Sequence, residues 1–473
     1  MPQHPNILFI NLDQLRYDCL GFTGHPLVKT PNLDALARSG LQFDSVYTPF
    51  PVCAPARQTL LTGVMPEQHG GLWNFDRGGG LPIGAASTAN NAVWVRQLRD
   101  SGYRTAYLGK WHVHPEADPT AYGYETYVEP PTNAYRPENQ SRRHALADDP
   151  WPEFPVGAVS TLDLEASDTH TLGAECCRLI GEFGTGDAPW HIRLDYNEPH
   201  LPCLPSEPFA SMYPPESIPP WENFAETFAG KPFIQQQQLR NWRIEGWTWR
   251  EWSIYLSGYY GMISQLDDAI GRIVEHLRSC GLLENTLIVF TTDHGDAAGS
   301  HRMMDKHYVM YEEEVHVPLV CSWPGVIPAG GVCRDFVSHF LDLPVTLLEL
   351  TGLPVPAHYQ GRSFRAQLEG RPAADPRPLA FSSYNGQQFG LYCQRMVRDR
   401  KYKYVWNATD IDECYDLEND PHELVNLAAD ERHDALCRRY RQKVYEVFAA
   451  LKDPLVLSRW NERWLRDGTP QIS

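Results

Sequence analysis

Two apolar segments of the sequence end in side chains that can bind a divalent cation. NILFINLDQ ends in Asp13 and Gln14, and TLIVFTTDHGD carries Asp293 and His294 directly after its apolar run. Carboxylate and amide oxygens with one imidazole suit Ca²⁺, with Mn²⁺ and Mg²⁺ as alternatives, better than they suit Zn²⁺. Because ligands of open α/β sheets bind beyond the carboxyl ends of the strands, we expect these residues to form one metal site. For Asp13 alone, the alternative is a cap on the following helix.

A third segment, PVCAPARQTLLTG, places Cys53 close to the expected start of a helix. Pro55 suits the first turn, residues 58–61 can continue the helix and Gly63 can end it. The free N–H groups and the helix dipole favour negative charge there, and Arg57, one turn on, would point to the same spot. The segment therefore predicts an oxyanion site beside Cys53, and the alternative is a half-buried structural cysteine.

Strand-like and helical patterns alternate around these segments. Apolar runs such as residues 6–13 and 286–292 alternate with amphipathic stretches such as 32–40, which predicts a mostly parallel sheet with helices on both faces. The longest helical pattern covers residues 257–281, where Gly281 can end the helix. Residues 114–165 and 203–255 break the alternation, and we expect long loops there that form pocket walls.

The pattern changes again near residue 370. Residues 369–378, EGRPAADPRP, are rich in Pro and are typical of a linker, and short strand patterns and a helix around 430–451 follow. We therefore predict an α/β fold in two parts. Residues 1–370 would form a catalytic domain around the large sheet, and residues 371–473 a small C-terminal α+β domain with an antiparallel sheet.

The composition argues against several classes of protein. Acidic residues outnumber basic ones 59 to 41, and a net charge of −18 argues against nucleic acid or an anionic membrane as a partner. No apolar run is long enough to span a bilayer, and MPQHPNILFI does not resemble a signal peptide. We therefore expect a cytoplasmic protein, or a periplasmic one if a leader was removed. The eleven cysteines include no CxxC spacing and are expected to be free thiols.

Cys53-Ala54-Pro55-Ala56-Arg57 resembles the Cys-x-Pro-x-Arg signature of the type I sulfatases, the formylglycine-dependent members of the alkaline phosphatase superfamily. Other segments resemble this family in the same order: NILFINLDQ, TPNLDALARSG, GKWH at 109–112, PHLP around His200, TTDHGDAAGSH, Lys306 and YDLENDPHELVNL. The resemblance covers most of the chain apart from the loops at 114–165 and 203–255. It implies an alkaline phosphatase-like fold and hydrolysis of sulfate monoesters.

The resemblance also implies how the site would work. A formylglycine-generating maturation enzyme would oxidise Cys53 to formylglycine, whose hydrated aldehyde is the nucleophile. One divalent metal would be held by an oxygen of that residue together with Asp13, Gln14, Asp293 and His294. The remaining roles would be held by Arg57 (holding the diol), Lys110 and Lys306 (binding sulfate), His112 (accepting a proton from the second hydroxyl) and His200 (protonating the leaving group).

Three points stay open on the sequence. Gln14 stands where many family members have a second aspartate, which weakens the preference for Ca²⁺ and favours Mn²⁺. The Asp-Gln pair also occurs in relatives that hydrolyse phosphonate monoesters and phosphodiesters, although those tend to lack the segment with Lys110 and His112. A non-catalytic anion-binding homologue with unmodified Cys53 is the third possibility. The DHGDxxGSH pattern resembles bacterial glycan sulfatases and favours a carbohydrate sulfate, small or oligosaccharide, over an aryl sulfate.

Overall fold

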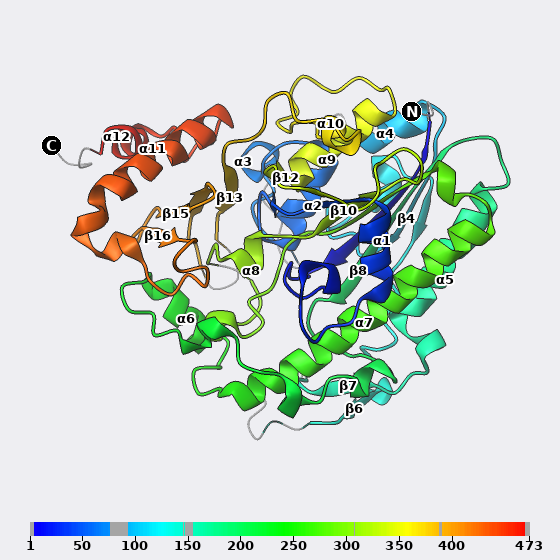
Figure 1. Ribbon diagram of the computed structural model, residues 1–473, viewed down its shortest axis with the longest axis horizontal. Coiled ribbons are helices and arrows are strands. Elements are labelled where there is room, and N and C mark those ends of the chain that lie inside the picture. Colours follow the sequence, from blue (N-terminus) through cyan, green and yellow to red (C-terminus); the bar gives the residue numbers. More distant parts are fainter. Residues whose placement is uncertain are drawn as a thin grey trace.

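The computed structural model describes residues 4–75, 93–144, 146, 155–306, 308–386 and 390–468. Its main sheet has eight strands: β1 (Asn6–Asp13), β2 (Leu41–Phe43), β4 (Arg104–Gly109), β5 (Thr126–Val128), β8 (Trp190–Pro199), β9 (Thr286–Thr292), β10 (Leu319–Ser322) and β11 (Gly331–Cys333). They follow the order β11-β2-β10-β9-β1-β8-β4-β5, and Figure 1 labels β10, β8 and β4 among them. Neighbouring strands are parallel except where β10 pairs with β2 and β9, so the mostly parallel sheet is confirmed.

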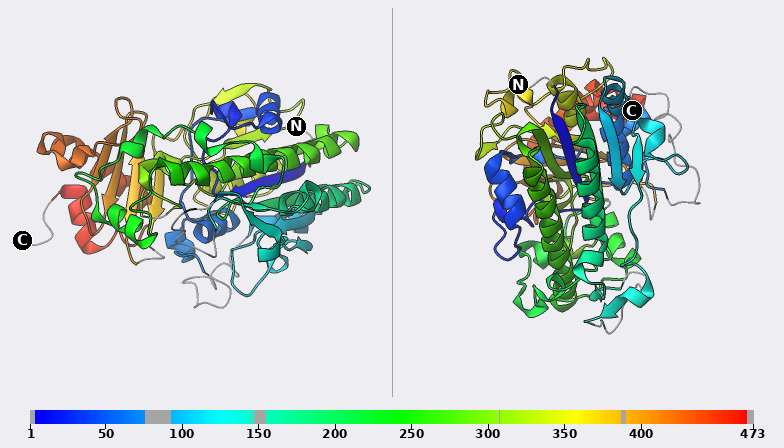
Figure 2. Two further views of the ribbon diagram at one scale, coloured as in Figure 1. Left: turned by 90° about the horizontal axis from the view of Figure 1, so that it is seen from below. Right: turned by 90° about the vertical axis from the view of Figure 1, so that its right-hand side faces the viewer.

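The central strand β1 explains why helices cover both faces of this sheet. Its side chains alternate, so that Leu8 and Ile10 belong to one buried cluster and Ile7 and Phe9 to another. Helices that contribute to the first cluster include α1 (Pro31–Ser39), α5 (Asp168–Phe183) and α7 (Trp249–Ser279). Helices that contribute to the second include α2 (Cys53–Thr62), α4 (Trp94–Asp100) and α9 (His339–Leu350). Figure 2 shows α5 and α7 running side by side along their face of the sheet.

The longest helix, α7, begins earlier than the pattern at 257–281 predicts. The first turn starts at Trp249, because the N–H of Thr248 donates to the carboxylate of Glu251 at 2.8 Å and closes a capping box. Trp252 is fully buried in this first part, with its ring centroid 4.9 Å from that of Trp247. Trp249 and Trp252, which the sequence placed in the loop at 203–255, therefore belong to α7, and Trp247 packs against it.

The rest of the two predicted loop regions contains only short elements. The first holds the two-stranded sheet of β6 (Gln140–Arg142) and β7 (Ala158–Ser160), and part of it lies outside the described residues. The second holds α6 (Phe233–Asn241), where Gln238 donates to the backbone carbonyl of Lys306 at 3.1 Å. This contact places α6 against the segment that carries a predicted sulfate ligand.

The C-terminal part contains the predicted antiparallel sheet. Its strands, β13 (Ala380–Tyr384), β14 (Gln394–Arg398), β15 (Tyr402–Asn407) and β16 (Glu413–Asp416), pair in sequence order. α11 (Asp434–Ala450) covers one face of it, and α12 (Arg459–Asp467) follows, at the left of Figure 1. Met65 and Leu341 join the same buried cluster. Because the two parts share this core, the boundary at residue 370 stays a prediction.

Two expectations from composition can be compared with the structure. All eleven cysteines are free thiols, as predicted. None of the helices in the described part of the chain combines the length and the apolar character that crossing a bilayer requires.

Candidate active site

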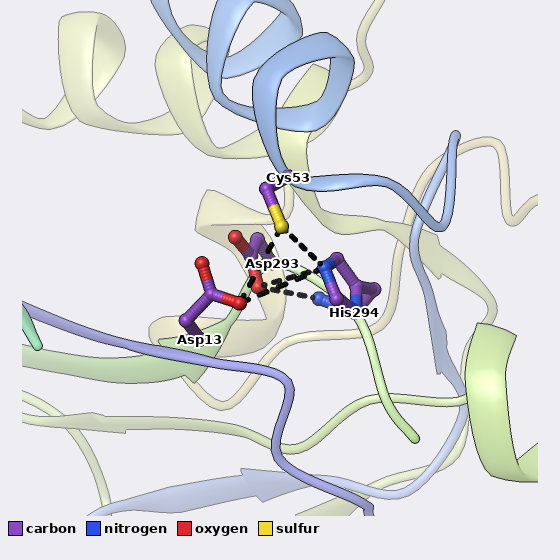
Figure 3. A group of neighbouring side chains, drawn as sticks. All are labelled: Asp13, Cys53, Asp293 and His294. Atoms are coloured by element: carbon purple, nitrogen blue, oxygen red, sulfur yellow. Dashed lines mark hydrogen bonds and ion pairs between the residues drawn. The ribbon is translucent and has the colours of Figure 1, made fainter. Parts of the chain in front are cut away.

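The carboxyl ends of neighbouring strands bring the predicted metal ligands together. β1 and β9 are parallel with Leu12 opposite Thr292, so that Asp13 and Asp293 emerge at the same edge of the sheet. The ligand atoms of Asp13, Cys53, Asp293 and His294 all lie within 4.8 Å of one another, and all four residues are buried. Figure 3 shows both carboxylates and the imidazole around the sulfur of Cys53. Residues 241 positions apart in sequence thus form one cluster.

Cys53 is the first residue of α2, which ends before Gly63 in the left-handed conformation at φ 67°. Its Sγ lies 3.1 Å from Nε2 of His294 and 3.5 Å from Oδ1 of Asp13. Burial alone would raise the pKa of this thiol, but the ammonium groups of Lys306 and Lys110 hold it well below its ordinary value. Cys53 therefore lies at a buried site that stabilises negative charge, unlike a cysteine packed among aliphatic side chains.

Arg57 forms ion pairs with the carboxylates of this cluster. Its guanidinium contacts Asp13 at 2.9 Å, Asp293 at 2.9 Å and Asp195 at 2.5 Å, and all of these side chains are fully buried. Burial acts to lower its pKa, but these carboxylates raise it well above its ordinary value. The arginine is thus permanently charged and fixes the orientation of two predicted metal ligands. Its predicted contact with the diol stays a prediction.

The charges of the cluster fit a bound cation. Burial and the neighbouring carboxylate of Asp13 raise the pKa of Asp293 to about 6. The pKa of Asp13 lies well below its usual range because Lys110 and Arg57 outweigh its burial and the repulsion from Cys53. Burial would lower the pKa of His294, but Asp293 and Cys53 raise it to about 9. Two carboxylates that repel each other beside an imidazole offer the oxygen-rich donor set that Ca²⁺ and Mn²⁺ prefer.

Lys110 is positioned by a close approach of two strands. It follows Gly109, whose φ is 92° and at which a Cβ would lie 2.0 Å from the carbonyl oxygen of Asp195. Only glycine fits at this position. Nζ of Lys110 reaches Oδ2 of Asp13 at 2.7 Å. The lysine of the GKWH segment therefore points into the cluster.

Lys306 reaches the site from the segment that follows β9. Its Nζ donates to Oε1 of Gln14 at 2.8 Å and to Asp305 at 3.0 Å, and it lies 3.0 Å from Nε2 of His200. Burial would lower its pKa, but Asp305 and Cys53 raise it above its ordinary value. The other nitrogen of His200 lies 2.7 Å from the carbonyl of Leu201, so that Nδ1–H donates there and Nε2 accepts from Lys306.

Gln14 and His112 complete the predicted set. The amide of Gln14 donates from Nε2 to Asp296 at 2.8 Å and accepts from Lys306, with its backbone in the left-handed conformation at φ 69°. Nε2 of His112 lies 3.0 Å from the carbonyl of Phe75, and this histidine helps to lower the pKa of Cys53. All the residues predicted for the site therefore gather around one point, although their individual roles stay predictions.

Two further buried acids support the site without having been predicted. Asp195 in β8 accepts from Arg57 and Arg193, and Asp296 holds the amide of Gln14 and accepts from Tyr255 at 2.9 Å. The sequence signal for Asp195 was a pair of charged residues, Arg193 and Asp195, within the apolar run WHIRLDY. Asp296 was visible as the second aspartate of DHGD.

Comparisons with known proteins agree with this geometry. A family model described as Sulfatase matches residues 5–353, and a second, described as N-sulphoglucosamine sulphohydrolase, C-terminal, matches residues 299–450. The chain is 27% identical over 469 residues to an arylsulfatase of Clostridium perfringens, with 91% of each covered. It is 26% identical over 510 residues to an N-acetylglucosamine-6-O-sulfatase of Bacteroides thetaiotaomicron, covering 95% of this chain and 87% of that protein.

Solved structures share the fold. The crystal structure of a phosphonate monoester hydrolase of Agrobacterium radiobacter matches with a TM-score of 0.79 and 29% sequence identity. The match covers 94% of this chain and 96% of the other. The alkaline phosphatase-like fold predicted from the sequence is therefore confirmed.

Proposed function

This chain belongs to the sulfatase family and is a sulfuric ester hydrolase, and we propose that it hydrolyses carbohydrate sulfates with a formylglycine made from Cys53 and one divalent metal ion. One observation carries the proposal. The Cys53 sulfur lies within 4.8 Å of three buried potential ligand atoms, and two lysines lower the pKa of its thiol. A site that stabilises negative charge at this position suits an attacking oxygen and a sulfate group.

Asp13, Gln14, Asp293 and His294 would hold the metal, whose charge would offset negative charge on the sulfate and the nucleophile. Ca²⁺ is our first candidate, because two carboxylates and an amide are hard oxygen donors. Mn²⁺ and Mg²⁺ are the alternatives, because Gln14 contributes no charge. The formylglycine would supply a geminal diol at position 53, so that one hydroxyl can attack sulfur and the other can later expel sulfate.

The lysines would bind the sulfate oxygens. Lys110 directly follows β4 and Lys306 lies in the segment after β9, and they donate to Asp13 and Gln14, at 2.7 and 2.8 Å. With a metal on those oxygens, both ammonium groups are released to donate to an anion. Arg57 would keep its contacts with the carboxylates and hold the ligands in place.

The two histidines would move protons. His200 lies beside Lys306, where its Nε2 would protonate the oxygen of the departing alcohol once both ring nitrogens carry protons. His112 would accept the proton of the second hydroxyl at position 53 through its Nδ1, since its Nε2 is directed to Phe75. Their different neighbours, Lys306 for His200 and the carbonyl of Phe75 for His112, give the two histidines different tasks.

Phosphonate monoester hydrolysis is the second candidate function. It is favoured by Gln14 and by the 29% identity to the Agrobacterium enzyme. The presence of Lys110 and His112 beside Cys53 supports the sulfate ester instead. A carbohydrate alcohol is supported by the 26% identity to the N-acetylglucosamine-6-O-sulfatase, and the 27% identity to an arylsulfatase keeps an aryl alcohol as the alternative.

The test is a side-by-side assay of the protein coexpressed with a formylglycine-generating enzyme. We expect kcat/KM for para-nitrophenyl sulfate to exceed that for para-nitrophenyl phenylphosphonate and for bis(para-nitrophenyl) phosphate. Higher turnover of either phosphorus ester would favour the second function. No turnover of any ester by fully converted, metal-loaded protein would favour an anion-binding homologue.

A further inference from the structure

A cavity opens beside the two GKWH residues of the site. It has a volume of about 510 Å³, and Lys110 and His112 are among its lining residues. Cavities of this size are typical of small-molecule sites. Because Lys110 also contacts Asp13 within the metal cluster, the cavity adjoins the position where the sulfate would be bound.

Three aromatic residues, Phe75, Trp111 and Tyr127, line the cavity. Two of these rings are held in place. The indole N–H of Trp111 donates to the carbonyl of Ala117 at 2.8 Å. The ring of Phe75 packs edge-on against that of His112, with 4.9 Å between the ring centroids. A fixed aromatic surface of this kind suits the apolar face of a sugar ring or an aryl group.

Among the described residues that line the cavity, Glu129 is the acidic one. It is exposed to solvent, and among the residues that the structure describes no cation forms an ion pair with it. Lys110, the lysine of the lining, would be engaged by the sulfate group, and no arginine is found among the described residues that line the cavity. An alcohol that carries a carboxylate would therefore meet repulsion from Glu129.

We propose that this cavity receives the alcohol part of the ester and that Glu129 selects against alcohols that carry a carboxylate. The substrates would be sulfates of neutral sugars or of amine-bearing sugars, whose ammonium can pair with Glu129, and not sulfates of uronic acids. The choice of sugar sulfates as ligands rests on the proposed function. The selection itself is a property of binding, so it can be tested without turnover.

The test measures binding to metal-loaded Cys53→Ala protein, which cannot turn over the ligands. Glucosamine O-sulfate and glucuronate O-sulfate, sulfated at the same ring position, are titrated by calorimetry with Glu129 intact and with Glu129→Gln. We expect glucosamine sulfate to bind more tightly, and the ratio of the two dissociation constants to fall about two- to fivefold in Glu129→Gln, the range of an exposed charge interaction. Glu138→Gln, an exposed glutamate that does not line the cavity, should leave the ratio unchanged.

Two results would overturn the inference: tighter binding of the uronate sulfate when Glu129 is intact, or a ratio that Glu129→Gln leaves unchanged. Failure of the proposed function looks different. It would appear as the absence of sulfate turnover by protein that retains Cys53, whatever the binding ratio is.

Discussion

The region around Arg395 and the region around Arg57 both bury charged side chains completely, and they differ in the groups that surround these charges. Beneath the C-terminal sheet, Arg395 of β14 contacts Asp453, Asn385 and Glu67. At the strand tips, Arg57 faces three carboxylates, and the pKa of Asp293 is raised to about 6 by burial and by Asp13. Burial of charge is common to both regions. What distinguishes the site that would take a cation is a pair of carboxylates that repel each other, beside a thiol whose pKa is lowered.

The largest difference between the two regions should appear on replacing Cys53. Cys53→Ala should lower kcat for sulfate esters by a factor of roughly 10⁴ or more, because it removes the nucleophile. The unfolding temperature should stay within about 4 °C of the wild type, because a small side chain is lost at the start of a helix. Cys280→Ala, at an exposed cysteine, is the matched control. Retained turnover, or a chain that does not fold, would contradict the assignment.

Replacing Arg395 should have the opposite outcome. Arg395→Met leaves Asp453 and Glu67 buried without their cation and should destabilise the protein by about 3–5 kcal/mol. Under conditions where the variant is folded, kcat should be close to that of the wild type. Denaturant unfolding and steady-state assays measure the two effects, and Arg438→Met on the exposed side of α11 is the control. A loss of kcat in the folded variant would mean that the two regions are coupled.

A third prediction concerns Asp293, one of the predicted metal ligands. Asp293→Asn removes one charged ligand, so bound metal per chain should fall and kcat should drop by about a hundredfold. Added metal should restore part of the activity. Elemental analysis after dialysis measures the metal content, with Asp100→Asn at the surface as control. If the metal content does not change, Asp293 is not a ligand.

A smaller effect is expected from a buried histidine that belongs to neither region. Burial lowers the pKa of His191 to about 3, whereas it is about 6.5 in the unfolded chain. The unfolded state therefore binds the proton first, and stability is full above about pH 6.5 and falls as the pH drops toward 3. Between pH 7 and pH 5 the wild type should lose about 2 kcal/mol more than His191→Leu does. Equal losses, measured by denaturant unfolding, would contradict this.

The sequence predicted the parts of the fold that depend on local patterns. The runs at β1 and β9 alternate between two cores, and the turn after α2 needs Gly63, so both were visible in advance. The true start of α7 was missed, because its capping box and buried Trp252 lie in a segment whose prolines and tryptophans indicated a loop. Local pattern could not reveal what those rings pack against.

The sequence likewise predicted only some of the residues of the candidate site. Asp13, Cys53 and Asp293 were found because strand tips and a helix start place them by simple rules. Asp195 and Asp296 were missed because their function is to hold Arg57 and Gln14, and such support depends on contacts between distant segments. The position of Arg57 beneath the carboxylates was missed for the same reason, because it depends on a contact with Asp13 in a distant segment.

The most direct test of the central claim is a plot of specific sulfatase activity against the fraction of Cys53 that has become formylglycine. Peptide mass spectrometry gives this fraction, since conversion replaces sulfur and two hydrogens with one oxygen. Preparations made with different amounts of the maturation enzyme supply the range. We predict a straight line through the origin. Activity that does not depend on conversion would contradict the role assigned to Cys53.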